Sequence, residues 1–210
     1  RIAIVSAIII LFGLYTHIRA WQWSDNIRLY LTEVSYHPKS ARANYEAGKV
    51  FGQRLERRQG DPKANYQAAI IHFQQVTLLQ ENSTSGLFGS ILASIDSGNA
   101  IKPEWIDELA LRLATQPLQQ VSLVWLAKIT DCIARGKCRK NDLQLPRLAE
   151  SALVYKEVSR NSKALLYTIL GRYYYMVEKD YNKAIEFGRK AISTKPSYLY
   201  YRLNLVKYLI

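Results

Sequence analysis

Two segments of this chain share one pattern of small and large residues, and this internal repeat limits the fold more than any other feature. The segments span residues 40–81 and 163–196. The aligned positions are Gly48 with Gly171, Phe51 with Tyr174, Tyr66 with Tyr181, Ala69 with Ala184, Phe73 with Gly188 and Val76 with Ala191. Small residues at such spacing permit two helices to approach closely, and aromatic residues fill the space between neighbouring pairs.

The pattern resembles the tetratricopeptide repeat (TPR), a helix-turn-helix unit. Residues 179–185, "KDYNKAI", match it most closely, whereas the first segment carries an insertion at residues 54–63 and the first helix of the second segment is one residue too long. The helical segments between the two units show a weaker version of the pattern. We expect an all-α fold, a TPR-like α-solenoid of four helix pairs and a half over residues 40–210, in which each pair packs only on its neighbours.

The chain begins with an apolar run, because Ile2 to Ile18 contains no charged residue. A hydrocarbon core of about 30 Å requires about 20 apolar residues in a helix. Arg19, Trp21 and Trp23 follow the run, and such side chains favour the headgroup level of a membrane. We therefore expect a transmembrane helix at residues 1–20, as the last span of a longer membrane protein.

Two other interpretations of the apolar run fit less well. A secretory signal peptide ends in a small-residue cleavage site, and "THIRAWQW" offers no such site. A helix buried in a protein core would not explain the aromatic and basic residues at its end. We therefore retain the membrane span.

Residues 21–39 form the predicted link between the membrane and the repeats. Ser24 or Asp25 can cap a helix, and Pro38 ends it because the residue before a proline leaves the helical region. An apolar face runs along this amphipathic helix. The sequence leaves open whether that face lies on the membrane or packs on the repeat domain.

The chain carries a formal net charge of +12, which attracts anionic partners without choosing among them. We do not expect nucleic-acid binding, because the basic residues are scattered and the tyrosines occupy repeat-core positions. The three histidines, His17, His37 and His72, show no metal-ligand spacing, and no phosphate-binding loop follows a strand. We therefore predict no catalytic residues, no metal and no cofactor in this segment.

The two cysteines, Cys132 and Cys138, bracket the sequence "IARGK". A helix end at Gly136 would bring their Cα atoms within the roughly 4.4–6.8 Å that a disulfide requires. The sequence favours a disulfide over two free thiols, and a disulfide would imply an extracytoplasmic compartment.

The junction between the apolar run and the first repeat resembles that in bacterial relatives of the transmembrane-and-TPR-containing (TMTC) proteins. The residues that carry this resemblance are Trp23, Asp25, Asn26, Leu29, Pro38, Ser40, Arg42, Ala43 and Gly48. It implies a polytopic inner-membrane protein with periplasmic repeats. It also implies a glycosyltransferase-like membrane part, dependent on polyprenol-phosphate sugars, that lies upstream of this segment.

The TPR register places one groove-facing pair of residues on the first helix of each of three units. These pairs are Tyr45 and Lys49, Thr168 and Arg172, and Leu203 and Lys207. The three basic residues of this set would form a line along the groove and suit an acidic protein or peptide segment. The alternative is that they are ordinary exposed positions of their helices.

Two functions follow from these expectations. The first is a membrane-tethered interaction module that recruits a protein or peptide at the envelope. The second is the acceptor-docking domain of a protein glycosyltransferase. In both, the apolar helix holds the repeats at the membrane and the repeats recognise the partner.

Overall fold

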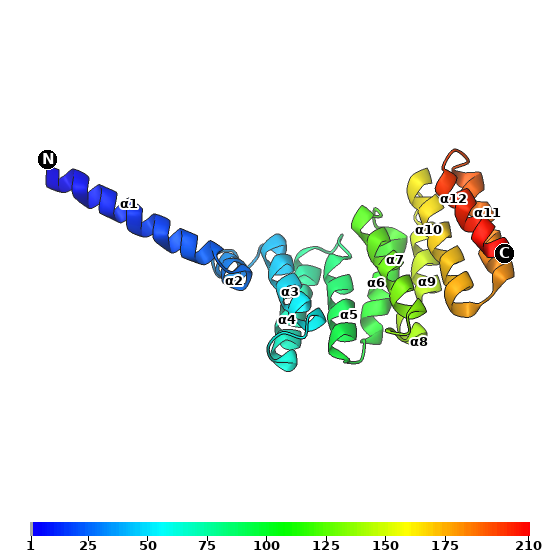
Figure 1. The fold of residues 1–210 in the computed structure, drawn as a ribbon, viewed down its shortest axis with the longest axis horizontal. Helices are drawn as coiled ribbons and strands as arrows, with labels where there is room; N and C mark the ends of the chain where they lie inside the picture. The colour runs from blue at the N-terminus through cyan, green and yellow to red at the C-terminus, as the bar shows by residue number, and fades with distance from the viewer. Residues whose placement is uncertain (1) are drawn as a thin grey trace.

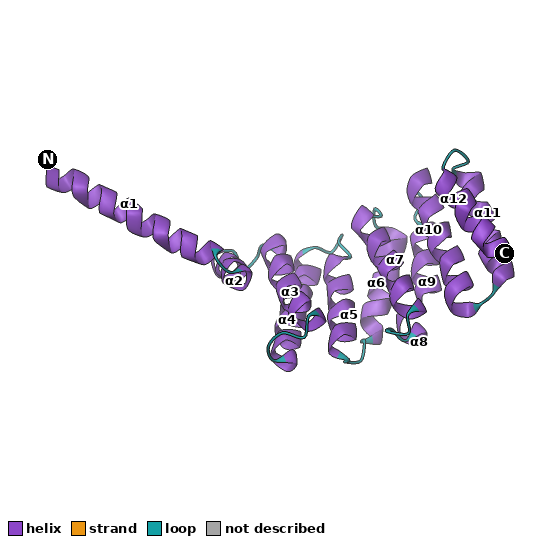
Figure 2. Cartoon of the chain, viewed as in Figure 1, coloured by secondary structure: helices purple, strands orange, loops and turns teal. Residues whose placement is uncertain are grey.

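The computed structural model describes residues 2–210, and this part of the chain is helical with no strand (Figure 2). The all-α prediction is therefore confirmed. The helices are α1 (Ile2–Trp23), α2 (Asn26–Tyr36), α3 (Ala41–Glu56), α4 (Pro62–Leu79), α5 (Ser85–Ser97), α6 (Pro103–Thr115), α7 (Gln120–Ala134), α8 (Lys140–Leu143), α9 (Leu145–Val154), α10 (Arg160–Tyr173), η1 (Tyr174–Glu178), α11 (Tyr181–Thr194) and α12 (Leu199–Leu209).

Helix α1 projects away from the other helices as a single rod (Figure 1). It has 22 residues, which corresponds to about 33 Å. None of its residues is buried. It is long and apolar enough to cross a membrane, and it ends slightly later than the expected span of residues 1–20.

Helix α2 begins where the sequence predicts and contacts both α1 and α3. The side chain of Asp25, rather than Ser24, caps it by accepting a hydrogen bond from the backbone N–H of Arg28 at 2.9 Å. The helix ends at Tyr36, two residues before Pro38. Packing on α3 is thus shown for this amphipathic helix.

The remaining helices stack side by side in pairs along the molecule (Figure 1). Helices α3, α5, α7, α10 and α12 form a first row, and α4, α6, α9 and α11 form a second row. Helices α3, α5, α7 and α10 contact one another in turn along the first row, and α12 meets α10 where Tyr208 lies against Gly171. Each helix of the second row packs on its partner in the first. Each pair therefore buries its apolar side against adjacent helices.

Local sequence signals explain where several of these helices start. Four of them begin after a residue whose side chain accepts a hydrogen bond from a backbone N–H of the first turn: Ser40, Asp61, Ser159 and Asp180. Such caps satisfy N–H groups that have no partner inside the helix. Gly98 ends α5 with φ of 72°, a left-handed conformation that glycine adopts readily at a helix end.

The main hydrophobic core runs through the middle of the stack, from α5 to α10. Its members are largely leucine and isoleucine, and the most deeply buried include Ile91, Leu109, Leu126, Leu148 and Leu166. A smaller cluster lies between α3, α4 and α5 around Phe73. The N-terminal pair is thus held by fewer buried side chains than the centre.

Two local features depart from the sequence expectation. The sequence "DLQLPRLAESALVYKEVSR", residues 142–160, predicts one helix, but Gln144 adopts φ of 45° and separates the short α8 from α9. The end of α10 widens into the π-helical turn η1. A π turn accommodates one additional residue, which matches the extra residue that the repeat alignment shows there.

Candidate functional site

A groove crosses α3, α5 and α7 of the first row. It consists of two hollows, of about 230 and 580 Å³, that share Glu56, Asp96 and Lys128 in their walls. We call it the α3–α5–α7 groove. Its principal residues are Tyr45, Lys49, Gln53, Glu56, Arg58, Asp96, Trp125, Lys128, Arg135 and Lys137.

The floor of the groove is aromatic. The ring of Phe73 lies between α3 and α5, where a Cβ added to Gly48 or Gly89 would come within 2.9 or 2.4 Å of it. These two glycines therefore leave room for the ring. The ring of Tyr45 lies 6.0 Å from that of Phe73, so the floor continues to the groove wall.

Trp125 forms the α7 side of the floor. Its indole Nε1 is buried and donates no hydrogen bond within the described residues. The ammonium group of Lys128 lies 4.5 Å from its ring centre, a cation–π distance. An apolar side chain of a partner would thus meet aromatic surface beside a positive charge.

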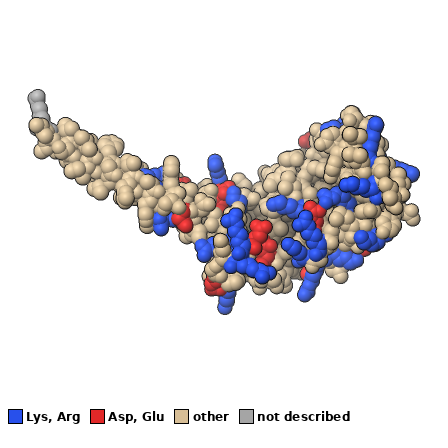
Figure 3. Space-filling model, in the orientation of Figure 1, with Lys and Arg blue, Asp and Glu red and all other residues tan. Residues whose placement is uncertain are grey.

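Basic and acidic side chains share the rim. Lys49 forms an ion pair with Glu46 at 2.5 Å, while Lys128, Arg135 and Lys137 form none among residues 2–210. Figure 3 shows an acidic patch in the region of α3 and α5, with Lys and Arg side chains on both sides. The uncompensated charge on the α7 side of the rim is positive.

Asp96 has the most strongly perturbed carboxyl group of the groove. Partial desolvation by the groove wall raises the pKa of Asp96 to about 6, the negative charge of Glu56 raises it further, and the positive charge of Lys137 opposes the rise. The side chain remains exposed at the surface. The negative charge of this part of the groove therefore weakens in mildly acidic solution.

The structure brings together only part of the predicted groove set. Tyr45 and Lys49 line the groove. Thr168 was expected to face a partner, but this is wrong. It is only 3% exposed, and its hydroxyl is satisfied without water because it donates to the carbonyl of Ala164 at 2.9 Å.

The other predicted positions lie outside the α3–α5–α7 groove. The guanidinium of Arg172 forms an ion pair with Asp131 of α7. Leu203 and Lys207 are exposed on α12. The expected basic line is therefore interrupted, since ion pairs neutralise Lys49 and Arg172.

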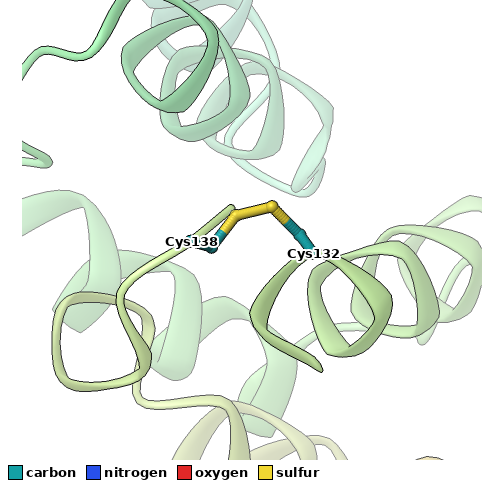
Figure 4. The surroundings of a disulfide bond; sticks show 2 residues. All are labelled: Cys132 and Cys138. Atoms are coloured by element: carbon teal, nitrogen blue, oxygen red, sulfur yellow. A yellow bond between two sulfur atoms is a disulfide. The ribbon is translucent and has the colours of Figure 1, made fainter. Parts of the chain in front are cut away.

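Cys132 and Cys138 form a disulfide at the end of α7 (Figure 4). Their Cα atoms are 5.4 Å apart, and the chain turns between them at Gly136 with φ of 69°. Cys132 also lines the wider hollow. The disulfide thus fixes the loop that carries Arg135 and Lys137 at the rim of the groove.

The residues expected at a membrane interface cluster at the end of α1. The guanidinium of Arg28 lies 3.6 Å from the ring centre of Trp21, and that of Arg19 lies 5.6 Å from the ring centre of Trp23. Trp21 and Trp23 are exposed. Aromatic and basic side chains are therefore combined where the apolar part of α1 ends.

Within residues 2–210, no three His, Cys, Asp or Glu side chains lie close enough together to bind a metal ion. His72 is held structurally, since its Nδ1 lies 3.1 Å from the Oδ1 of Asn44 and its ring stacks on Phe51. Burial lowers the pKa of His72.

The sequence did not single out Glu56, Asp96, Trp125 or Lys128 as site residues. These residues come from three helices, and tertiary packing determines which of their side chains meet. One local signal was available for Trp125, because Lys128 follows it at the i+3 spacing that places two side chains on one helix face.

Comparison of the chain with protein-family models, with curated proteins and with solved structures gave no match.

Proposed function

We propose that this chain is a membrane-tethered, TPR-like repeat module whose α3–α5–α7 groove binds an extended segment of a protein partner. The observation that carries the proposal is the groove itself, which combines an aromatic floor with charged walls. Aromatic side chains anchor apolar groups, and charges at a rim select and orient a partner. Helix α1 supplies the tether.

The groove favours a segment in which an apolar residue is followed by an acidic one. The apolar side chain would lie on Tyr45 and Trp125. The acidic side chain would reach Lys128 or Lys137, whose ammonium groups have no ion-pair partner among the described residues. Glu56 and Asp96 would repel the acidic residue if the segment were shifted along the groove, and this repulsion would fix the position at which the segment binds.

Selection from a random peptide library on the full chain in phosphatidylcholine nanodiscs tests the groove. We expect enriched peptides with the apolar-acidic pattern, and Trp125→Ala or Lys128→Glu should weaken their binding at least about tenfold. Lys63→Glu, an equal charge change at the start of α4 and outside the groove, should leave binding unchanged. Peptides that bind all three variants equally would contradict the proposal.

The proposed compartment is extracytoplasmic, at the periplasmic side of a bacterial inner membrane. The Cys132–Cys138 disulfide supports it, because thiols are kept reduced in the cytosol. Thiol labelling of intact cells before and after reduction tests it. Labelling of Cys132 and Cys138 that appears only after reduction supports periplasmic repeats. Thiols that react after lysis without reduction would instead place the repeats in the cytoplasm.

A second candidate is the acceptor-docking domain of a glycosyltransferase that uses polyprenol-phosphate sugars. The junction sequence from Trp23 to Gly48 favours it through its TMTC resemblance. This function uses the same groove, with the acceptor protein as its occupant. Transfer of sugar to a groove-bound peptide by the full-length parent would support it, and transfer that is insensitive to Trp125→Ala would exclude this role of the groove.

A further inference from the structure

A separate pocket of about 510 Å³ lies where α1, α2 and α3 meet. Its walls combine cationic, aromatic and acidic side chains from all three helices and from the turn before α3. The residues that matter are Arg19, Trp23, Tyr30, Glu33, His37 and Arg42. We call this the elbow pocket.

The elbow pocket begins where the apolar part of α1 ends. The side chains from Ile2 to Ile18 are exposed around the helix, and Arg19 is the first charged residue after them. If α1 spans a bilayer, as the proposed function holds, the pocket lies at the level of the lipid headgroups. This inference therefore rests on the membrane part of that proposal.

The two arginines of the pocket are free to bind an anion. Neither Arg19 nor Arg42 forms an ion pair within residues 2–210, and Arg19 donates one long hydrogen bond of 3.3 Å to Gln22. Arg42 lies in the first turn of α3, where the helix dipole adds positive potential. Guanidinium groups bind phosphate oxygens in a bidentate manner.

The acidic residues of the pocket differ in their availability. Glu46 is held by Lys49 in an ion pair of 2.5 Å, whereas Glu33 forms no ion pair among the described residues. A free carboxylate that lines the same pocket as two arginines suits a ligand that carries both a phosphate and a hydroxyl donor. Trp23 and Tyr30 supply the aromatic surface that is typical of a membrane interface.

We propose that the elbow pocket binds the headgroup of an anionic, hydroxyl-bearing membrane phospholipid. Arg19 and Arg42 hold its phosphodiester, and Glu33 accepts a hydrogen bond from its hydroxyl. The bound lipid would fix the angle between the membrane helix and the repeats, because the pocket spans the joint between them.

Mixed nanodiscs of phosphatidylglycerol and phosphatidylcholine test this proposal. The full chain is released into the gas phase and its retained lipids are counted by native mass spectrometry. We expect enrichment of phosphatidylglycerol, reduced about fivefold by each of Arg19→Gln and Arg42→Gln. The matched control is Arg189→Gln, which removes one exposed positive charge on α11, outside the pocket.

The outcomes separate the pocket from the membrane tether. Carbonate extraction of each variant first shows whether α1 is inserted. Failure of the wild type to insert overturns both the tether and the pocket. Insertion without phosphatidylglycerol enrichment overturns the pocket alone, and so does an equal loss of enrichment in the control, which would indicate general charge attraction.

Discussion

Arg112 is predicted to hold the first and second helix pairs, α3–α4 and α5–α6, together, and its replacement by methionine should be among the most damaging single changes in the repeats. The side chain projects from α6 and is 8% exposed. Its guanidinium donates to the carbonyls of Thr77, Gln80 and Ser83 at 3.3, 3.0 and 2.7 Å. It thus caps the C-terminal end of α4, whose last carbonyls have no partner within the helix.

The expected cost follows from these contacts. Hydrogen bonds to a charged group contribute about 1.5–3 kcal/mol each and do not add fully, and methionine retains the apolar stem. Glu108, which pairs with Arg112 at 2.7 Å, is 40% exposed and can be solvated when the arginine is lost. We therefore expect Arg112→Met to lower the free energy of unfolding by about 3 kcal/mol.

The matched control is Arg147→Met. Arg147 also forms an ion pair at 2.7 Å, with Asp107, but both side chains are exposed, at 48% and 62%. Water screens such a pair, so its loss should cost about 0.5 kcal/mol. Urea unfolding of the full chain in detergent micelles, followed by far-UV circular dichroism, compares the two. Equal costs, or a cost below about 1 kcal/mol for Arg112→Met, would refute the capping argument.

Three further predictions concern the groove. Gly89→Ala should destabilise the chain by about 1–3 kcal/mol because its Cβ would lie 2.4 Å from the ring of the floor, whereas Gly52→Ala, with 4.0 Å to the same ring, should be neutral or stabilising in thermal unfolding. Replacing Cys132 and Cys138 by serine should cost about 2 kcal/mol, since the closed loop is short; reduction of the wild type should cost the same and leave the variant unchanged. Asp96 has a pKa of about 6 in the folded protein and near 3.8 in the unfolded one, so its contribution to the free energy of unfolding should fall as pH rises from about 4 to about 6. Asp96→Asn should remove this pH dependence and raise the free energy of unfolding by about 0.5 kcal/mol at neutral pH. An unchanged pH dependence in the variant would contradict the raised pKa of Asp96.

Local signals in the sequence predict the helices well. Asp25 and Ser40 cap the helices that they precede, Gly98 ends α5, and Pro103 begins α6. Each of these effects depends on one or two neighbouring residues, so no knowledge of the fold is required. The cysteine pair was predictable for the same reason.

The groove was less predictable because it depends on which helices become neighbours. Tyr45, which its repeat position predicts as a groove residue, lines the α3–α5–α7 groove. The equivalent residue in the second unit, Thr168, is buried. A helical threonine tolerates burial because its hydroxyl can donate to the backbone carbonyl four residues earlier. Position within a repeat therefore does not determine exposure in a chain whose units differ.

The contribution of Arg112 could not be anticipated from its surroundings in the sequence. It lies on an amphipathic helix and is paired with Glu108 at the i, i+4 spacing, which is the usual pattern of an exposed residue. Its other partners are backbone carbonyls at the end of α4 and in the loop that follows it, 29 to 35 residues earlier. Only the stacking of the pairs brings them together.

Photo-crosslinking in intact cells tests most directly whether the α3–α5–α7 groove binds a protein partner. The photoreactive residue p-benzoylphenylalanine replaces Gln53 in the groove or, as the control, Ile71, which is exposed on α4. We expect a membrane-associated crosslink to one partner from Gln53 that Trp125→Ala abolishes, and no crosslink from Ile71. Equal crosslinking from both positions, or a Gln53 crosslink that survives Trp125→Ala, would contradict recognition through this groove.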